Sequence, residues 1–211
     1  MQRHFDSSRA STGRPVHPLW LRISHGVNAL AVLVLVASGW RIYNAAPLFP
    51  FRFAAELTLG GWLGGALQWH FAAMWLLAAN GLVYLALNLA TGRLAKRFFP
   101  LSPRGVWCDA IAALHGRLAH ADPRQYNQVQ RLAYLLALVD SVMLVLSGLV
   151  LWKSVQFGVL RELLGGYEAA RRIHFVAMAV LVGFVVLHLA MVALVPRTLT
   201  TMLGGASRSA S

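Results

Sequence analysis

The sequence contains four long apolar segments, each about as long as a helix that crosses a lipid bilayer. A membrane-spanning helix needs roughly 20 mainly apolar residues. Four ranges meet this requirement: 19–42, 66–91, 132–152 and 170–195. Only 12% of the 211 residues are charged, whereas about 25% are charged in an ordinary soluble domain. The sequence therefore predicts an all-α, integral membrane four-helix bundle.

The positions of the basic residues predict the direction of these helices. The N-terminal segment through Arg22, the loop between the second and third spans (93–131) and the segment after the fourth span contain 13 of the 19 basic residues. Because cytoplasmic loops are rich in Lys and Arg, both termini are expected on the cytoplasmic side of a bacterial inner membrane. The net charge of +12 is interpreted as this topology signal, and no nucleic-acid binding is expected. The expected organisation is a basic cytoplasmic tail (1–18), the bundle (19–203) and a flexible tail (204–211).

A short surface helix is expected between the second and third spans. Ser102 and Pro103 are typical of an N-cap followed by the first helical position. The helix would run to about His120, with apolar residues facing lipid and charged residues facing water.

Four of the eight histidines lie inside the predicted spans, where ionisable residues are costly and mark candidate functional sites. His174 and His188 are 14 residues apart, which places them on one helix face at depths about 21 Å apart. His70 matches the depth of His174, and His25 matches that of His188, when the spans alternate in direction. We call His70 and His174 the outer pair, and His25 and His188 the inner pair, after the predicted orientation.

Two imidazoles that face each other across a gap can supply both axial ligands of a b-type haem. The sequence therefore predicts two haem b groups, with the iron atoms bound by His25 and His188 and by His70 and His174. Cys108 is the only cysteine, which excludes covalent haem attachment through paired thiols. For any single histidine, an interhelical hydrogen bond is an equal alternative.

Other polar residues in or beside the spans have two possible roles each. Arg22, Arg171 and Arg172 could bind haem propionates or could anchor the helices at the membrane surface. Asp140 lies inside the third span, where it could make a structural hydrogen bond or take part in quinone protonation.

A set of motifs extends along most of residues 17–203: His17-Pro18 with Arg22, His25 and Asn28; Ser38-Gly39; residues 42–45, 69–71 and 80–84; and Ile173-His174-Phe175 with His188. Through these motifs the chain resembles the bacterial cytochrome b561 and nickel-hydrogenase cytochrome b family. More narrowly, it is similar to thiosulfate-reductase-type cytochrome b subunits. Gly26 departs from the family pattern, which has an aromatic residue after the first histidine.

The resemblance implies a fold of four helices in which the same histidines ligate two haems in the same pairing. It also implies exchange of electrons with a quinone, for which Asn28 and Asp140 are the candidate quinone or proton-path residues. A periplasmic redox subunit, often a molybdopterin oxidoreductase, is the implied protein partner.

Three functions remain open at this point. The first is a di-haem cytochrome that transfers electrons between a periplasmic redox partner and the quinone pool. The second is a stand-alone superoxide:quinone oxidoreductase. Basic residues near the outer pair would attract its anionic substrate, superoxide. The third is a haem-free membrane anchor or transporter. No catalytic residue is assigned, and the pattern does not predict the oligomeric state.

Overall fold

Four long helices make up most of the described chain. The computed structural model describes residues 18–91, 102–114 and 128–194. All four long helices have the length and apolar composition needed to cross a membrane. They are α1 (Leu19–Ala45), α2 (Leu63–Ala90), α5 (Gln128–Trp152) and α7 (Tyr167–Leu194). The predicted all-α bundle is thus confirmed, and the chain is a multi-pass membrane protein.

The helices extend slightly beyond the predicted spans. α5 begins four residues before the predicted start at residue 132, and α1 ends three residues after residue 42. Hydropathy marks only the part of a helix that crosses lipid, whereas the backbone stays helical into the membrane surface because its N–H and C=O groups still need partners. The predicted tails, 1–18 and 204–211, lie outside the described residues apart from Pro18.

The starts of the helices follow from local sequence. Pro18 is extended, and its carbonyl accepts hydrogen bonds from the backbone of Leu21 and Arg22 at the start of α1. Gly60 and Gly61 precede α2, and Gly165 and Gly166 precede α7, all with positive φ angles. This conformation is readily adopted only by glycine. The glycine pairs therefore turn the chain sharply into its second and fourth crossings.

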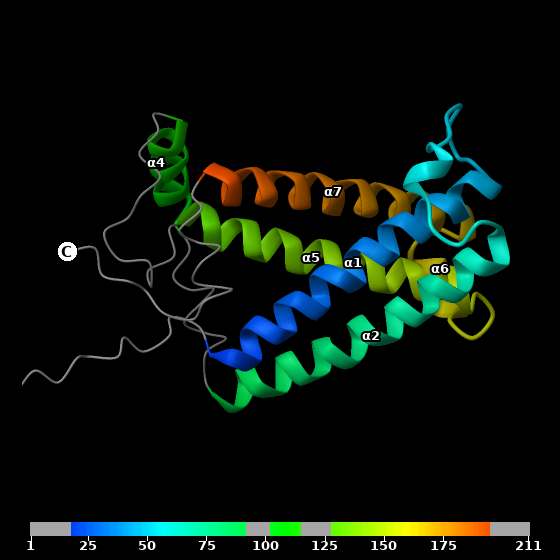
Figure 1. Cartoon of the computed structure of the whole chain (residues 1–211), viewed down its shortest axis with the longest axis horizontal. Helices are drawn as coiled ribbons and strands as arrows, with labels where there is room; N and C mark the ends of the chain where they lie inside the picture. Colours follow the sequence, from blue (N-terminus) through cyan, green and yellow to red (C-terminus); the bar gives the residue numbers. More distant parts are fainter. Residues whose placement is uncertain (1–17, 92–101, 115–127, 195–211) are drawn as a thin grey trace, which may run out of the picture.

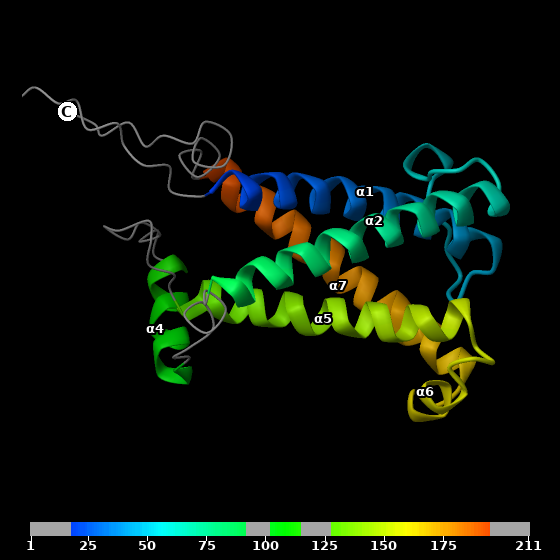
Figure 2. The ribbon, with the colours of Figure 1, turned by 90° about the horizontal axis from the view of Figure 1, so that it is seen from below.

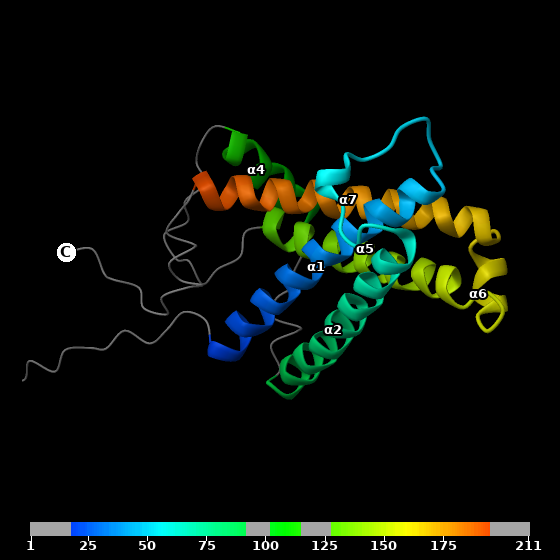
Figure 3. The same ribbon diagram turned by 45° about the vertical axis from the view of Figure 1, so that its right-hand side comes forward.

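The four helices form two antiparallel hairpins. α1 packs along α2, and α5 packs along α7, whereas helices of different hairpins make only sparse contacts within the described residues. Figures 1 and 3 show the two hairpins side by side, and Figure 2 shows α7 crossing the bundle at an angle to α1. Small buried side chains permit close packing inside each hairpin: Ala31, Ala66, Ala73, Ala170 and Ala177. The space between the hairpins is correspondingly poor in protein contacts.

An aromatic cluster closes the bundle at the end where α2 and α7 begin. The 3-10 helix η1 (Ala55–Leu57) and the short helix α6 (Gly158–Leu163) lie at this end. The ring of Tyr43, at the end of α1, lies 4.9 Å from that of Phe175 on α7. The amide of Asn44 donates to the carbonyl of Phe53 and accepts from its N–H. These contacts fix the first loop over the ends of both hairpins.

The predicted surface helix is present at the opposite end as α4 (Pro103–Leu114). Its axis runs across the long helices instead of along them (Figures 1 and 2). The hydroxyl of Ser102 accepts a hydrogen bond from the N–H of Gly105, as expected of an N-cap. Asp109 holds α4 against the start of α5 by accepting a hydrogen bond from the N–H of Gln128. Residues 115–120 of the predicted helix lie outside the described residues.

Candidate functional site

The inner pair brings together one histidine from each hairpin. The rings of His25 on α1 and His188 on α7 have centroids 6.1 Å apart, with their planes at 73°. Phe184 lies one turn before His188 and stacks on its ring at 6.3 Å. Both imidazoles are exposed in the isolated chain. They therefore meet in the poorly packed space between the hairpins, with their rings accessible to another group.

The separation of these rings fits ligation of one metal ion from two sides. An imidazole nitrogen lies about 2 Å from the metal that it binds, and the ring centre lies about 1 Å further away. Two such rings on opposite sides of one ion would have centroids roughly 6 Å apart. The residues present thus fit a b-type haem, whose iron takes two axial ligands while its apolar ring lies between helices.

The outer pair has a different setting from the inner pair. His70 on α2 and His174 on α7 are partly buried and close enough to interact electrostatically. The Nδ1 atom of His70 lies 3.0 Å from the hydroxyl oxygen of Ser38 on α1. The Nδ1 atom of His174 lies 3.0 Å from that of Ser147 on α5. Each outer imidazole is therefore held by the first helix of its own hairpin.

Two glycines of the first helices, Gly39 on α1 and Gly148 on α5, lie next to these imidazoles. A Cβ atom added to Gly39 would be 3.6 Å from Cε1 of His70, and one added to Gly148 would be 3.3 Å from Cε1 of His174. By contrast, a Cβ on Gly183 would meet nothing within 4 Å. Gly39 and Gly148 thus make room for the imidazole rings, while Gly183 leaves open space beside α7.

The serines were not recognised as candidate residues from the sequence. Their signal is a Ser-Gly pair that occurs once in the first helix of each hairpin, as Ser38-Gly39 and Ser147-Gly148. The contact itself depends on how far each helix is rotated toward its neighbour, which hydropathy does not determine. The repeated Ser-Gly pair inside two apolar spans is the sequence feature that could have indicated these residues.

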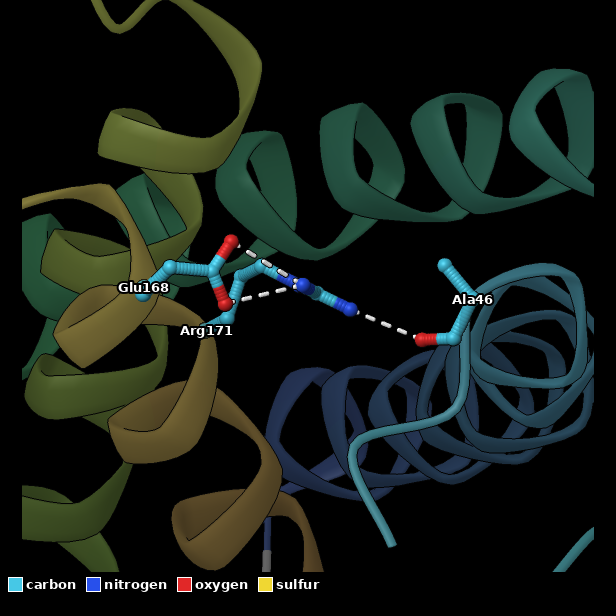
Figure 4. A network of polar contacts seen from close by, with 3 residues as sticks. All are labelled: Ala46, Glu168 and Arg171. Atoms are coloured by element: carbon cyan, nitrogen blue, oxygen red, sulfur yellow. Dashed lines mark hydrogen bonds and ion pairs between the residues drawn. The ribbon is translucent and has the colours of Figure 1, made fainter.

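The predicted propionate candidates have unequal surroundings. The Arg171 guanidinium donates to both carboxylate oxygens of Glu168, at 3.1 and 2.9 Å, and to the carbonyl of Ala46 at 2.7 Å. Figure 4 shows it reaching from α7 to the segment that follows α1. Arg172 is exposed, and Arg22 lies near the inner pair, three residues before His25. Arg171 thus joins the two hairpins, a contact that neither interpretation from the sequence predicted.

The predicted quinone or proton-path residues lie in separate places. Asn28 accepts a hydrogen bond from the amide of Asn80 at 2.6 Å, and the same amide donates to the carbonyl of Ser24 at 2.9 Å. This places Asn28 in a contact between α1 and α2, one turn from His25. Asp140 is partly buried on α5, and its Oδ2 atom is buried with no hydrogen-bond partner among the described residues.

A cavity of about 360 Å³ lies apart from all four histidines. It opens at the end of α1 near the first loop, and Arg41 and Arg52 line it together with Asn44 and Phe53. The histidine pairs are instead marked by the ring separation, by the serine contacts and by the sparse packing between hairpins.

Comparison with known proteins gives consistent matches over nearly the whole chain. A family model described as prokaryotic cytochrome b561 matches residues 16–205. A protein of Azospira oryzae, named as a candidate protein-methionine-sulfoxide reductase subunit, YedZ1, is 64% identical over 190 residues, covering 90% of this chain and 96% of that protein. A candidate Ni/Fe-hydrogenase B-type cytochrome subunit of Cupriavidus necator is 25% identical over 204 residues, covering 87% of this chain and 82% of the relative.

Proposed function

The chain belongs to the prokaryotic cytochrome b561 family, and from this membership we propose that it conducts electrons across the membrane between the quinone pool and a redox protein. As a member, it is a membrane b-type cytochrome that takes part in electron transfer. The proposal adds two haem b groups, one ligated by the inner pair and one by the outer pair. Haem b supplies one-electron transfer through its ferric and ferrous states.

The observation that carries this proposal is the approach of His25 and His188 from different hairpins to 6.1 Å between ring centroids. Their helices are otherwise sparsely packed against each other. The outer histidines sit at the other end of the same space, since His174 precedes His188 by 14 residues on α7. Two ligand pairs about 21 Å apart along one helix would give electrons a path across most of the bilayer.

We propose that the partner is the catalytic subunit of a reductase that acts on oxidised methionine in proteins. The support is the name of the Azospira oryzae relative, which the chain covers almost completely. Reduction of a methionine sulfoxide to the thioether consumes two electrons and two protons and releases water. Electrons would then flow from quinol to the partner, through the inner site and then the outer one. This fits a periplasmic partner and an inner-membrane location with both termini in the cytoplasm.

The alternative of a stand-alone superoxide:quinone oxidoreductase has less support. It depended on attraction of an anion by basic residues near the outer pair. Two of these are paired with carboxylates, Arg161 with Glu162 at 2.8 Å and Arg171 with Glu168 at 2.9 Å. Because these pairs reduce the local positive charge, we favour the electron conduit. The third possibility, a haem-free anchor or transporter, does not account for family membership.

The first test is to purify the full chain from a membrane fraction and count its haem with the pyridine haemochrome assay. Two haem b groups per chain are expected. Both should be reduced when a quinol is added to the purified protein. Zero haem would overturn the function, and one haem would overturn the two-site assignment. Superoxide-dependent quinone reduction by the isolated chain would instead support the enzyme alternative.

A further inference from the structure

A serine and a glycine meet a histidine ring in the same way in both hairpins. In the first, Ser38 and Gly39 of α1 contact His70 of α2. In the second, Ser147 and Gly148 of α5 contact His174 of α7. The hydroxyl-to-Nδ1 distance is 3.0 Å in both cases.

The direction of each serine contact follows from counting protons. The hydroxyl of Ser38 lies 2.6 Å from the carbonyl oxygen of Val34. The hydroxyl of Ser147 lies 2.6 Å from that of Met143. A carbonyl can only accept, and a hydroxyl has only one hydrogen to donate. Each serine oxygen is therefore left to accept from its histidine, and the backbone carbonyls of Leu35 and Leu144 also accept from His70 and His174. Since both kinds of contact need a donor on the imidazole, Nδ1 of each histidine carries the hydrogen.

This arrangement determines which ring nitrogen is free. A neutral imidazole has one N–H and one nitrogen with a lone pair. With the hydrogen on Nδ1, the lone pair of both His70 and His174 is on Nε2. A metal ligand must have a free lone pair. Both outer histidines are therefore in the tautomer that can bind iron through Nε2.

Burial makes the contact durable. The side chains of Ser38 and Ser147 have no exposed surface, so water does not compete for the hydroxyl oxygen. The missing Cβ of the adjacent glycine lets the Nδ1–Cε1 edge of each ring approach the first helix, where an added methyl carbon would be 3.6 Å or 3.3 Å from Cε1. The same edge of each ring thus makes the hydrogen bond to the serine and lies close to the glycine.

We propose that Ser38 and Ser147 are positioning residues that fix the tautomer and the orientation of the outer haem ligands. The proposal rests on the proposed function, because it requires a haem at the outer pair. Among the described residues, neither ring of the inner pair has a hydrogen-bond partner, so the device belongs to the outer site alone. A hydrogen-bond acceptor on Nδ1–H increases the basicity of the ligand, which favours the ferric state of the outer haem.

The test uses Ser38→Ala and Ser147→Ala in the full chain loaded with haem. Each variant should shift the midpoint potential of the outer haem to a more positive value and leave that of the inner haem unchanged. Loss of a partner that orients a ligand commonly weakens metal binding by about 10- to 100-fold. Transfer of the outer haem to apomyoglobin should become correspondingly faster. Ser38→Thr and Ser147→Thr keep the hydroxyl and should restore the wild-type potential.

Ser141→Ala is the matched control, because the hydroxyl of Ser141 also donates to a carbonyl on its own helix, that of Ala137, but is exposed. It should change neither potential. Unchanged potential and unchanged haem release in both alanine variants would overturn the proposal. If one of the two alanine variants does not accumulate, the other still tests the proposal. Failure of the proposed function would give a different result, because the wild-type chain itself would lack the outer haem. His70→Ala and His174→Ala identify that haem, since each should remove it.

Discussion

The imidazole rings of His25 and His188 approach each other from two hairpins whose long helices make only sparse contacts with each other, with centroids 6.1 Å apart and planes at 73°. The two residues are far apart in the sequence and on different sides of the bundle's internal space. Apolar packing between their helices does not explain this approach, because both imidazoles are exposed in the isolated chain. The proposed haem, ligated by both rings, would explain it.

Replacing His188 by alanine should remove the inner haem and leave most of the outer one. The reason is that the proposed outer ligands, His70 and His174, are held by serines of their own hairpins and do not depend on the inner ring. The haem content should fall from two to one per chain in the pyridine haemochrome assay. His174→Ala should remove the other haem. His120→Ala is a control that should retain two, and loss of both haems from a well-folded single variant would contradict the pairing.

Alanine at Gly148 should perturb the outer site more than alanine at Gly39. The added methyl carbon would lie 3.3 Å from the ring of His174 in the first case and 3.6 Å from the ring of His70 in the second. The shorter contact requires the ring to move, whereas the longer one is an ordinary van der Waals distance. The absorbance of the reduced outer haem should therefore decrease more in Gly148→Ala than in Gly39→Ala. Gly183→Ala, where the methyl group meets nothing within 4 Å, is the control and should retain both haems.

The sequence could predict the number, approximate bounds and contents of the helices, because hydropathy and helical periodicity act within one segment. It could also predict that His25 and His188 lie at one depth, since depth follows from residue number along a straight helix. It could not predict that Ser38 reaches His70, because that contact depends on the rotation of α1 about its own axis. The same holds for Arg171, whose contact with the carbonyl of Ala46 joins elements that are distant in the sequence.

Replacing Asn80 by alanine should loosen the α1–α2 hairpin near the inner site. The Asn80 amide donates to the carbonyl of Ser24 and to the side chain of Asn28. Interhelical hydrogen bonds in membranes contribute roughly 0.6 kcal/mol on average and up to about 1.7 kcal/mol. We expect a destabilisation in this range and a preferential loss of the inner haem, measured by thermal denaturation in detergent with absorbance at the Soret band. Equal loss of both haems would argue against a local effect.

Asp140→Asn should leave folding and both haem spectra unchanged. The Oδ2 atom of Asp140 is buried but has no hydrogen-bond partner among the described residues, so the amide would break no contact made by that atom. Because an uncompensated charge is costly inside a membrane, the amide also imitates the protonated acid. The informative measurement is the rate of haem reduction by quinol. A slower rate with intact spectra would support a proton-path role, while poor expression would show that the carboxyl group is structural.

Arg171→Ala should destabilise the chain without changing the potential of the outer haem. The guanidinium already binds Glu168 and the carbonyl of Ala46, which joins the end of α1 to the start of α7 (Figure 4). Hydrogen bonds to charged groups contribute about 1.5 to 3 kcal/mol when well formed, and partial exposure of this side chain reduces that value. We expect a loss of about 1 kcal/mol, seen as a lower Tm in detergent. Arg172→Ala is the matched neighbour and should have a smaller effect on Tm. A shift of the outer potential in Arg171→Ala, with Tm unchanged, would show instead that this arginine acts on a haem propionate.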